Sequence, residues 1–201
     1  MIVYLESNFV LELAFLQAEH DECSALLRLA EVGKISLILP AFSIGEPYET
    51  WVRRTKRRRQ IHEDLTTAIR ELSRSSPYEA ASERFHELTS ILIRSGEEEK
   101  RRLDETLEGI LQTVEVIPVG LNVMSAAISL QEKLNLSPQD SIVYASVLDH
   151  LNAKSRERCC FITRNSRDFA NPHIEHELSS RDCLLLTKFA DGMGYVRRHL
   201  Q

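Results

Sequence analysis

Short apolar runs recur along the chain and alternate with longer stretches in which apolar residues fall at helical spacing. The runs are brief and mostly β-branched or aliphatic, as expected of parallel strands whose sheet is covered on both faces. Strands that alternate with helices predict an α/β fold with a mainly parallel sheet. The predicted strands are Ile2–Leu5, Ile35–Leu39, Val114–Val119, Cys159–Thr163 and Cys183–Thr187.

The helical stretches are of two kinds. Most are amphipathic segments of ordinary length, but 52–112 is long, charged and rich in helix formers, with one interruption at Ser73–Pro77. This segment predicts a helical hairpin inserted at about 52–113 between the second and third strands of a single domain that spans 1–201. The other predicted helices are Phe9–Leu16, Asp21–Ala30, Leu121–Leu134, Ser137–Leu151 and Lys188–Leu200.

Composition removes several classes of protein. No apolar run approaches the roughly 20 residues of a membrane helix, and the start of the chain lacks the pattern of a signal peptide. Neither GxxxxGK[ST] nor GxGxxG occurs, which argues against a nucleotide-fuelled or Rossmann enzyme. The four cysteines contain no CxxC pair, so neither a disulfide framework nor a zinc site is predicted. We expect a cytoplasmic protein without a membrane partner.

Charge is unevenly distributed. The chain has a net charge of −5, yet residues 52–102 hold 13 basic and 9 acidic side chains. A basic segment on an acidic body suits a polyanion, and the excess carboxylates suit cations. The densest basic cluster is either a solvated helix face or a contact surface for phosphates. Its members are Arg53, Arg54, Lys56, Arg57, Arg58 and Arg59.

Four acidic residues each follow an apolar segment and lie where a helix is predicted to begin: Glu6, Glu46, Asp140 and Asp168. In open α/β sheets the functional crevice lies beyond the carboxyl ends of the strands. Clustered carboxylates repel one another unless cations join them, and Mg²⁺ or Mn²⁺ prefers oxygen ligands. The pattern therefore predicts a divalent metal site.

Helix capping is the competing interpretation of the same residues. Ser43 and Glu46, Ser137 and Asp140, and Asn165 and Asp168 have the spacing of a capping box or its variants. Under this hypothesis the protein is an α/β protein whose four acids only cap helices, lie dispersed around the fold and bind no Mn²⁺. Capping leaves unexplained an acid at the end of a strand and the convergence of four such positions on one edge.

Four segments resemble the motifs of PIN domains. Val3–Asn8 resembles the family's opening strand, and Glu46 matches its helix glutamate. Ser137–Ala145 resembles the Pro-x-Asp helix start, and Phe161–Phe169 resembles the Thr-Arg-Asn-x-x-Asp-Phe element. The order agrees over nearly the whole chain outside 52–112. The resemblance implies a PIN-like parallel-sheet α/β/α sandwich with an inserted helical hairpin.

The resemblance also implies a function, namely a divalent-metal-dependent endoribonuclease that cuts single-stranded RNA, in many members as the toxin of a toxin–antitoxin pair. The implied partners are RNA, a protein antitoxin and a second copy in a homodimer. The implied metal ligands for Mg²⁺ or Mn²⁺ are Glu6, Glu46, Asp140 and Asp168, with Asn165 as a further catalytic residue. The expected substrate contacts are Ser7, Asn8, Arg53, Arg54, Arg57 and Arg58.

One departure from the family pattern is Glu6, where the first acid is usually Asp. The extra methylene moves the carboxylate by up to roughly 1.5 Å. This either weakens activity or favours Mn²⁺ over the geometrically stricter Mg²⁺, or the backbone compensates. Glu6 also supports an alternative function, a degenerate PIN domain that binds RNA or protein without cutting, whereas Glu46, Asp140, Asn165 and Asp168 argue against it.

Overall fold

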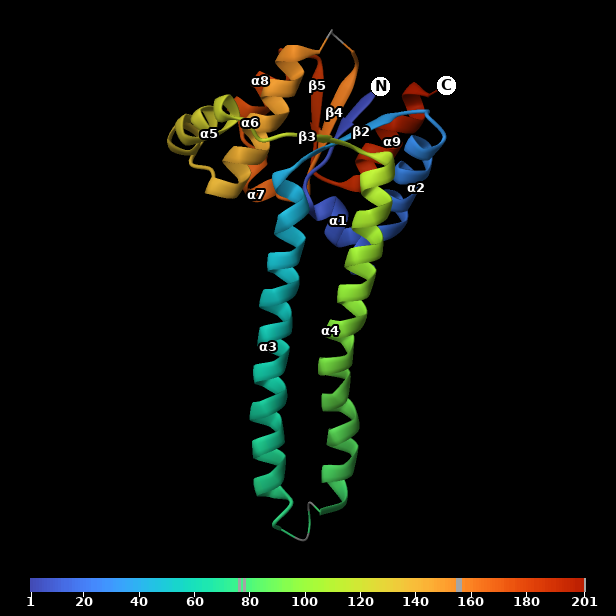
Figure 1. Cartoon of the computed structure of the whole chain (residues 1–201), viewed down its shortest axis with the longest axis vertical. Coiled ribbons are helices and arrows are strands. Elements are labelled where there is room, and N and C mark those ends of the chain that lie inside the picture. Colours follow the sequence, from blue (N-terminus) through green and yellow to red (C-terminus); the bar gives the residue numbers. More distant parts are fainter. Residues whose placement is uncertain (76, 78, 155–156, 201) are drawn as a thin grey trace. The chain divides into compact units, whose positions relative to one another are not determined.

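Five parallel strands form one sheet in the order β3-β2-β1-β4-β5 (Figure 1). The computed structural model describes residues 1–75, 77, 79–154 and 157–200, with no side chains described for 79–88. All pairings are parallel, and Tyr4 pairs with Ile38 on one side and with Phe161 on the other. The α/β prediction is confirmed. The strands are β1 Ile2–Tyr4, β2 Ser36–Pro40, β3 Glu115–Ile117, β4 Cys159–Ile162 and β5 Cys183–Leu186.

Helices cover both faces of this sheet (Figure 1). On one face α6 contacts β2 and α8 contacts β5, with α5 packed against α6. On the other face α2 contacts β2, and α9 contacts β4 and β5. The result is an α/β/α sandwich. The helices are α1 Ser7–Ala14, α2 His20–Glu31, α5 Leu121–Leu134, α6 Pro138–Ala153, α7 Ser166–Phe169, α8 Pro172–Ser179 and α9 Phe189–His199.

The core follows the alternation of side chains along the strands. Tyr4 and Phe161 are fully buried on the face covered by α6, where Phe161 packs edge-on against Phe169 with ring centroids 5.2 Å apart. On the opposite face, Phe9 of α1 meets Phe189 of α9 at 5.9 Å. Burying each such ring contributes about 1.5–3 kcal/mol, so the sheet is fixed from both sides.

The predicted insertion consists of two long helices, α3 (Phe42–Leu72) and α4 (Glu79–Thr113). The break between them falls at the predicted interruption, of which Ser76 lies outside the described residues. The chain divides into two compact units, one comprising Met1–Pro47 with Glu105–Gln201 and the other Tyr48–Asp104. The predicted insertion at 52–113 thus overlaps most of the second unit, and the first residues of α3 and the last residues of α4 are part of the first unit.

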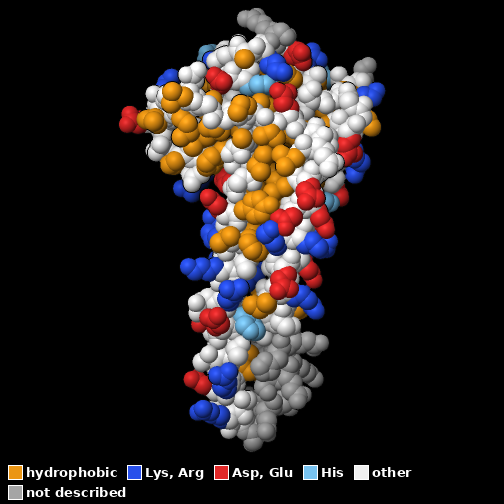
Figure 2. Space-filling view, in the orientation of Figure 1, with side chains coloured by type: hydrophobic (Ala, Val, Ile, Leu, Met, Phe, Trp, Pro, Cys, Tyr) orange, Lys and Arg blue, Asp and Glu red, His pale blue; other side chains and the backbone are white. Residues whose placement is uncertain are grey.

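Within the second unit, polar contacts join the two helices. Trp51 donates from Nε1 to the Gly96 carbonyl at 2.8 Å, and Arg58 forms two hydrogen bonds of 2.7 Å with Glu99. A Cβ at Gly96 would lie 3.3 Å from Oγ1 of Thr55, so glycine permits the close approach of the helices there. Figure 2 shows acidic and basic side chains interspersed on the visible surface of these helices.

The surface of the first unit carries an exposed apolar row on α5. Leu121, Met124 and Ile128 of α5 are exposed, and apolar side chains gather over this part of the unit in Figure 2. In the described part of the chain, no helix has the length and apolar character needed to cross a membrane.

Candidate active site

Glu6 lies two positions after Tyr4, the last residue of β1, and caps the N-terminus of α1. It is 5% exposed, and its two carboxylate oxygens accept five hydrogen bonds. Three come from its neighbours: Ser7 Oγ at 3.1 Å, the Asn8 backbone N–H at 3.0 Å and Asn8 Nδ2 at 2.7 Å. Ser7 and Asn8, which we expected to contact substrate, are thus engaged with Glu6.

The other two donors to Glu6 come from the end of β4. Thr163 Oγ1 donates to Oε1 at 3.1 Å, and the Arg164 backbone N–H donates to the same oxygen at 3.3 Å. Thr163 Oγ1 also accepts from the Asn165 backbone N–H at 2.9 Å. Since β1 and β4 are neighbours in the sheet, Glu6 ties together the carboxyl ends of two strands.

Asp140 and Asn165 meet beside this junction. Asp140 lies in the first turn of α6, where the backbone N–H of Asp140 donates to the cap residue Ser137 and Ser137 Oγ donates to Oδ2 of Asp140 at 2.6 Å. Asn165 Nδ2 donates to Oδ1 of Asp140 at 3.0 Å. The predicted Ser137 cap is therefore formed, but the Asn165 side chain forms no cap and reaches Asp140 instead.

Burial changes the acidity of both carboxyls. Desolvation raises the pKa of Glu6 above its usual value, although the donors from Asn8, Ser7 and Arg164 oppose the shift. Desolvation also raises the pKa of Asp140, and the nearby charge of Asp168 adds to the rise. Asp168 is half-buried in the first turn of α7. At least two of the predicted acids, Asp140 and Asp168, are thus close enough to influence one another.

Glu46 lies in the first unit near the start of α3, beyond the carboxyl end of β2, and is half-buried. The predicted capping box with Ser43 is wrong, because α3 begins at Phe42 and Ser43 lies inside the helix. Ser43 is completely buried, and its hydroxyl has no hydrogen-bond partner among the described residues. The sheet order places the ends of β2, β1 and β4 side by side, so Glu46 belongs to the same edge as Glu6.

A second polar network, centred on Glu12, is linked to this edge through Arg164. Glu12 of α1 is 1% exposed; it binds the Arg164 guanidinium and accepts from the Glu19 backbone N–H at 2.7 Å. Glu19 in turn accepts from the Phe189 backbone N–H at 3.1 Å and lies 3.6 Å from Arg164 Nε. The sequence offered one signal for this network, a lone acid inside the apolar stretch Phe9–Leu16, which our site prediction did not use.

Carboxylate oxygens suit a hard divalent cation, and the four predicted acids follow elements that lead to one edge of the sheet. Two observations bear on this fit. A carboxylate offers about four lone-pair sites, so the five donors around Glu6 saturate it. Across the residues that the structure describes, no three His, Cys, Asp or Glu side chains are already arranged to hold a metal. Metal binding at this edge would therefore require side chains to reorient.

The predicted basic contacts belong to the second unit. Arg53 and Arg57 are exposed, Arg54 is half-buried, and Arg58 is paired with Glu99. The pair with Glu99 raises the pKa of Arg58 and holds its guanidinium against α4. Arg58 is thus the least available of the four for phosphate.

Comparison with known proteins identifies one family and several similar solved structures. VapBC2 from Rickettsia felis, solved with a promoter DNA fragment, shares 13% identity at a TM-score of 0.46 and covers 92% of this chain and 97% of its own. A toxin–antitoxin complex from Klebsiella pneumoniae shares 16% identity at a TM-score of 0.39 and covers 85% and 92%. No curated protein matches the chain. The PIN domain model matches residues 3–169, which include all four acids and Asn165, and the chain therefore belongs to the PIN domain family.

Proposed function

We propose that this protein is a divalent-metal-dependent endoribonuclease that hydrolyses single-stranded RNA in the cytoplasm. The observation that carries the proposal is the meeting of Asp140, Asn165 and Asp168 beside the buried Glu6 at the carboxyl edge of the sheet. Membership of the PIN family supplies the class of chemistry, since its members are nucleases that generally use divalent metals.

In this proposal Glu46, Asp140 and Asp168 hold Mg²⁺ or Mn²⁺, and Glu6 joins them by giving up one of its five hydrogen bonds. Divalent cations at such a site lower the pKa of water and stabilise the leaving oxygen of a phosphodiester. Asn165 orients the Asp140 carboxylate through its 3.0 Å hydrogen bond. Ser137 does the same from the other oxygen, so Asp140 is held in position before substrate arrives.

RNA would be held through its phosphates by the exposed basic residues of α3, chiefly Arg53 and Arg57, with Arg54 beside them. Aromatic residues do not interleave with this cluster, so the contacts would be electrostatic and sensitive to salt. The proposed protein partners are an antitoxin that blocks the site and a second copy of the chain.

The test is cleavage of a mixed single-stranded RNA with Mn²⁺, with Mg²⁺ and with a chelator, followed by analysis of the ends. The proposal requires metal-dependent cuts that leave 5′-phosphate and 3′-hydroxyl ends. The saturation of Glu6 favours the alternative of a degenerate PIN domain. RNA binding that persists without any cleavage in either metal would establish that alternative.

A further inference from the structure

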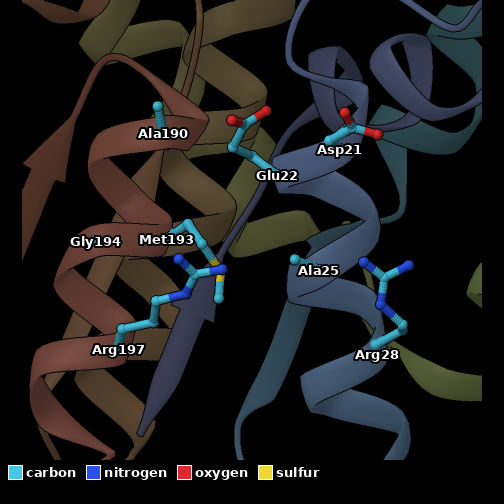
Figure 3. Close-up of a pocket in the computed structure, with 8 residues that line it drawn as sticks. All are labelled: Asp21, Glu22, Ala25, Arg28, Ala190, Met193, Gly194 and Arg197. Atoms are coloured by element: carbon cyan, nitrogen blue, oxygen red, sulfur yellow. The ribbon is translucent and has the colours of Figure 1, made fainter.

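The helices α2 and α9 run side by side and parallel on one face of the sheet, with a hollow of about 350 Å³ between them (Figure 3). Residues one turn apart line it from both helices, so that Ala25 of α2 faces Met193 of α9. A second hollow continues beyond the C-terminal ends of both helices, where Val32 is 67% and Leu200 is 37% exposed. Apolar side chains lie in the floor of this groove, among them Ala25, Leu29 and Met193.

The acidic and the basic side chains of this groove lie apart from each other along its length. Asp21 and Glu22 lie at the end formed by the first turns, and Arg28 and Arg197 lie at the end formed by the last turns (Figure 3). Asp21, Arg28 and Arg197 are exposed and Glu22 is half-buried. Within the described part of the chain, none of these four side chains has an ion-pair partner within 4 Å.

The helix dipole explains the signs of these charges on each helix alone, since acids favour N-termini and bases favour C-termini. It does not explain why an apolar floor joins the two ends. Because the helices are parallel, Arg28 and Arg197 lie at the same level, two turns from the acids, so the first hollow has an acidic end and a basic end. The second hollow extends the apolar floor past the arginines to Val32 and Leu200. Such a surface is complementary to itself when one copy is turned end for end.

We propose that this groove, lined by Asp21, Glu22, Ala25, Arg28, Met193 and Arg197, is a self-association surface that binds the same groove of a second copy. A two-fold axis across the helices places the same patch on both copies, as in the isologous interfaces of most dimers. Asp21 and Glu22 of each copy then face Arg28 and Arg197 of the other, and the apolar floors are buried between them. The inference rests on the second copy named in the proposed function and adds the surface that binds it; none of these residues is a proposed metal ligand.

The test uses two reversal variants of the full chain. Asp21→Lys with Glu22→Lys makes the groove wholly basic, and Arg28→Glu with Arg197→Glu makes it wholly acidic. We expect the wild type to self-associate in sedimentation equilibrium, less so as salt rises, because a Debye length of about 10 Å at 0.1 M screens exposed charges. Each variant alone should associate at least about 100-fold more weakly, since like charges would face each other. An equimolar mixture of the two should pair again.

Matched controls separate this surface from helix stability. Asp191→Lys and Arg198→Glu reverse charges in the same turns of α9 without lining the groove, and both should leave association unchanged. Circular dichroism checks each fold, and if the reversal variants unfold, Asp21→Asn with Glu22→Gln should weaken association and its salt dependence. A wild type that stays monomeric to millimolar concentration would overturn the proposal. Reversal variants that still dimerise alone, for instance through the exposed apolar row of α5, would also overturn it, as would a mixture that fails to pair.

Discussion

Asn165 donates from Nδ2 to Oδ1 of Asp140 over 3.0 Å, although the two residues are 25 positions apart. The bond joins the turn after β4 to the first turn of α6, and so links two of the motifs that pointed to a nuclease. An asparagine that only capped α7 would point its side chain at its own helix. Its direction instead identifies Asp140 as the carboxylate that the turn is built to position.

The first prediction concerns that carboxylate. Asp140→Asn should lower metal-dependent RNA cleavage by more than about 100-fold, because loss of a ligand should exceed the 10–100-fold typical of outer-shell changes. The melting temperature should change little, since asparagine retains an oxygen for Asn165 and its amide can donate to Ser137 Oγ in place of accepting from it. Asp149→Asn, an exposed acid on the same helix, is the control and should cut at the wild-type rate. Full activity in Asp140→Asn would refute the proposed site.

The second prediction concerns pH. The pKa of Asp140 is raised in the folded protein from an ordinary 3.8, so the folded state holds its proton longer than the unfolded state. The contribution of Asp140 to the free energy of unfolding therefore falls as pH rises from about 4 through the raised pKa. Urea midpoints measured between pH 4 and 7 without metal should fall less steeply in Asp140→Asn. Mn²⁺ should reduce the fall in the wild type, because it binds the ionised form; identical slopes in both proteins would contradict the prediction.

The third prediction concerns the network beneath the site. Arg164→Ala leaves the buried Glu12 carboxylate without its guanidinium partner, while the Glu19 backbone N–H remains. We expect the free energy of unfolding to fall by about 2–3 kcal/mol, less than for a fully buried pair because Arg164 is 39% exposed. Arg167→Ala, an exposed arginine three positions on, should change it by less than about 0.5 kcal/mol. Equal effects in urea titrations would remove Arg164 from the network.

The fourth prediction compares two ion pairs of the second unit. Arg58 and Glu99 form two 2.7 Å hydrogen bonds with side chains 24% and 11% exposed. Glu99→Ala should destabilise the helical hairpin by about 1.5–3 kcal/mol, followed by helical ellipticity in urea. Glu98→Ala should cost no more than about 1 kcal/mol, because its partners Arg94 and Arg102 lie at 3.9 and 4.0 Å and Glu98 is 53% exposed. A larger loss at Glu98 would contradict this ranking.

The fifth prediction concerns the contact of α9 with the sheet. A Cβ at Gly192 would lie 2.3 Å from Cδ1 of Ile162, so Gly192→Ala should destabilise the protein by about 1–3 kcal/mol. Adding Ile162→Val, which removes that methyl group, should recover part of the loss in thermal unfolding. Gly109→Ala meets no atom within 4 Å and should instead stabilise its helix by up to about 1 kcal/mol. A neutral Gly192→Ala would show that α9 can shift freely on β4.

The sheet was predictable because strands buried on both faces must be apolar throughout, and this pattern stands out beside charged helices. The α8 helix is absent from the predicted helices, because the residues around Asn171-Pro172 also have the polar pattern of a loop. In the structure Asn171 Oδ1 accepts from the His173 backbone N–H at 2.9 Å, so the same two residues start a helix. The local signal supports either outcome, and packing of Ile174 in the core decides it.

The site was predictable only in part, for a physical reason. An acid after a strand end or at a helix start can be recognised locally, and Glu6 and Asp140 were predicted in this way. Saturation of Glu6 depends on Thr163, 157 positions away, and the partner of Glu12 is 152 positions away. Among the six basic residues of the cluster at 53–59, charge alone cannot distinguish Arg58, which faces α4, from Arg57, which faces solvent. These distinctions arise only when distant elements pack.

The hydrogen bond between Tyr48 and Asp104, at 2.8 Å, has a consequence for how the chain folds. β2 and β3 pair in parallel across the entire insertion, and closing a long flexible loop costs entropy before any contact forms. A helical hairpin forms from contacts local to itself, and this bond brings together residues 56 positions apart. Once α3 and α4 are joined, the loop that remains to be closed is short. Compared with a flexible loop of the same length, the folded hairpin therefore lowers the entropic barrier to completing the sheet.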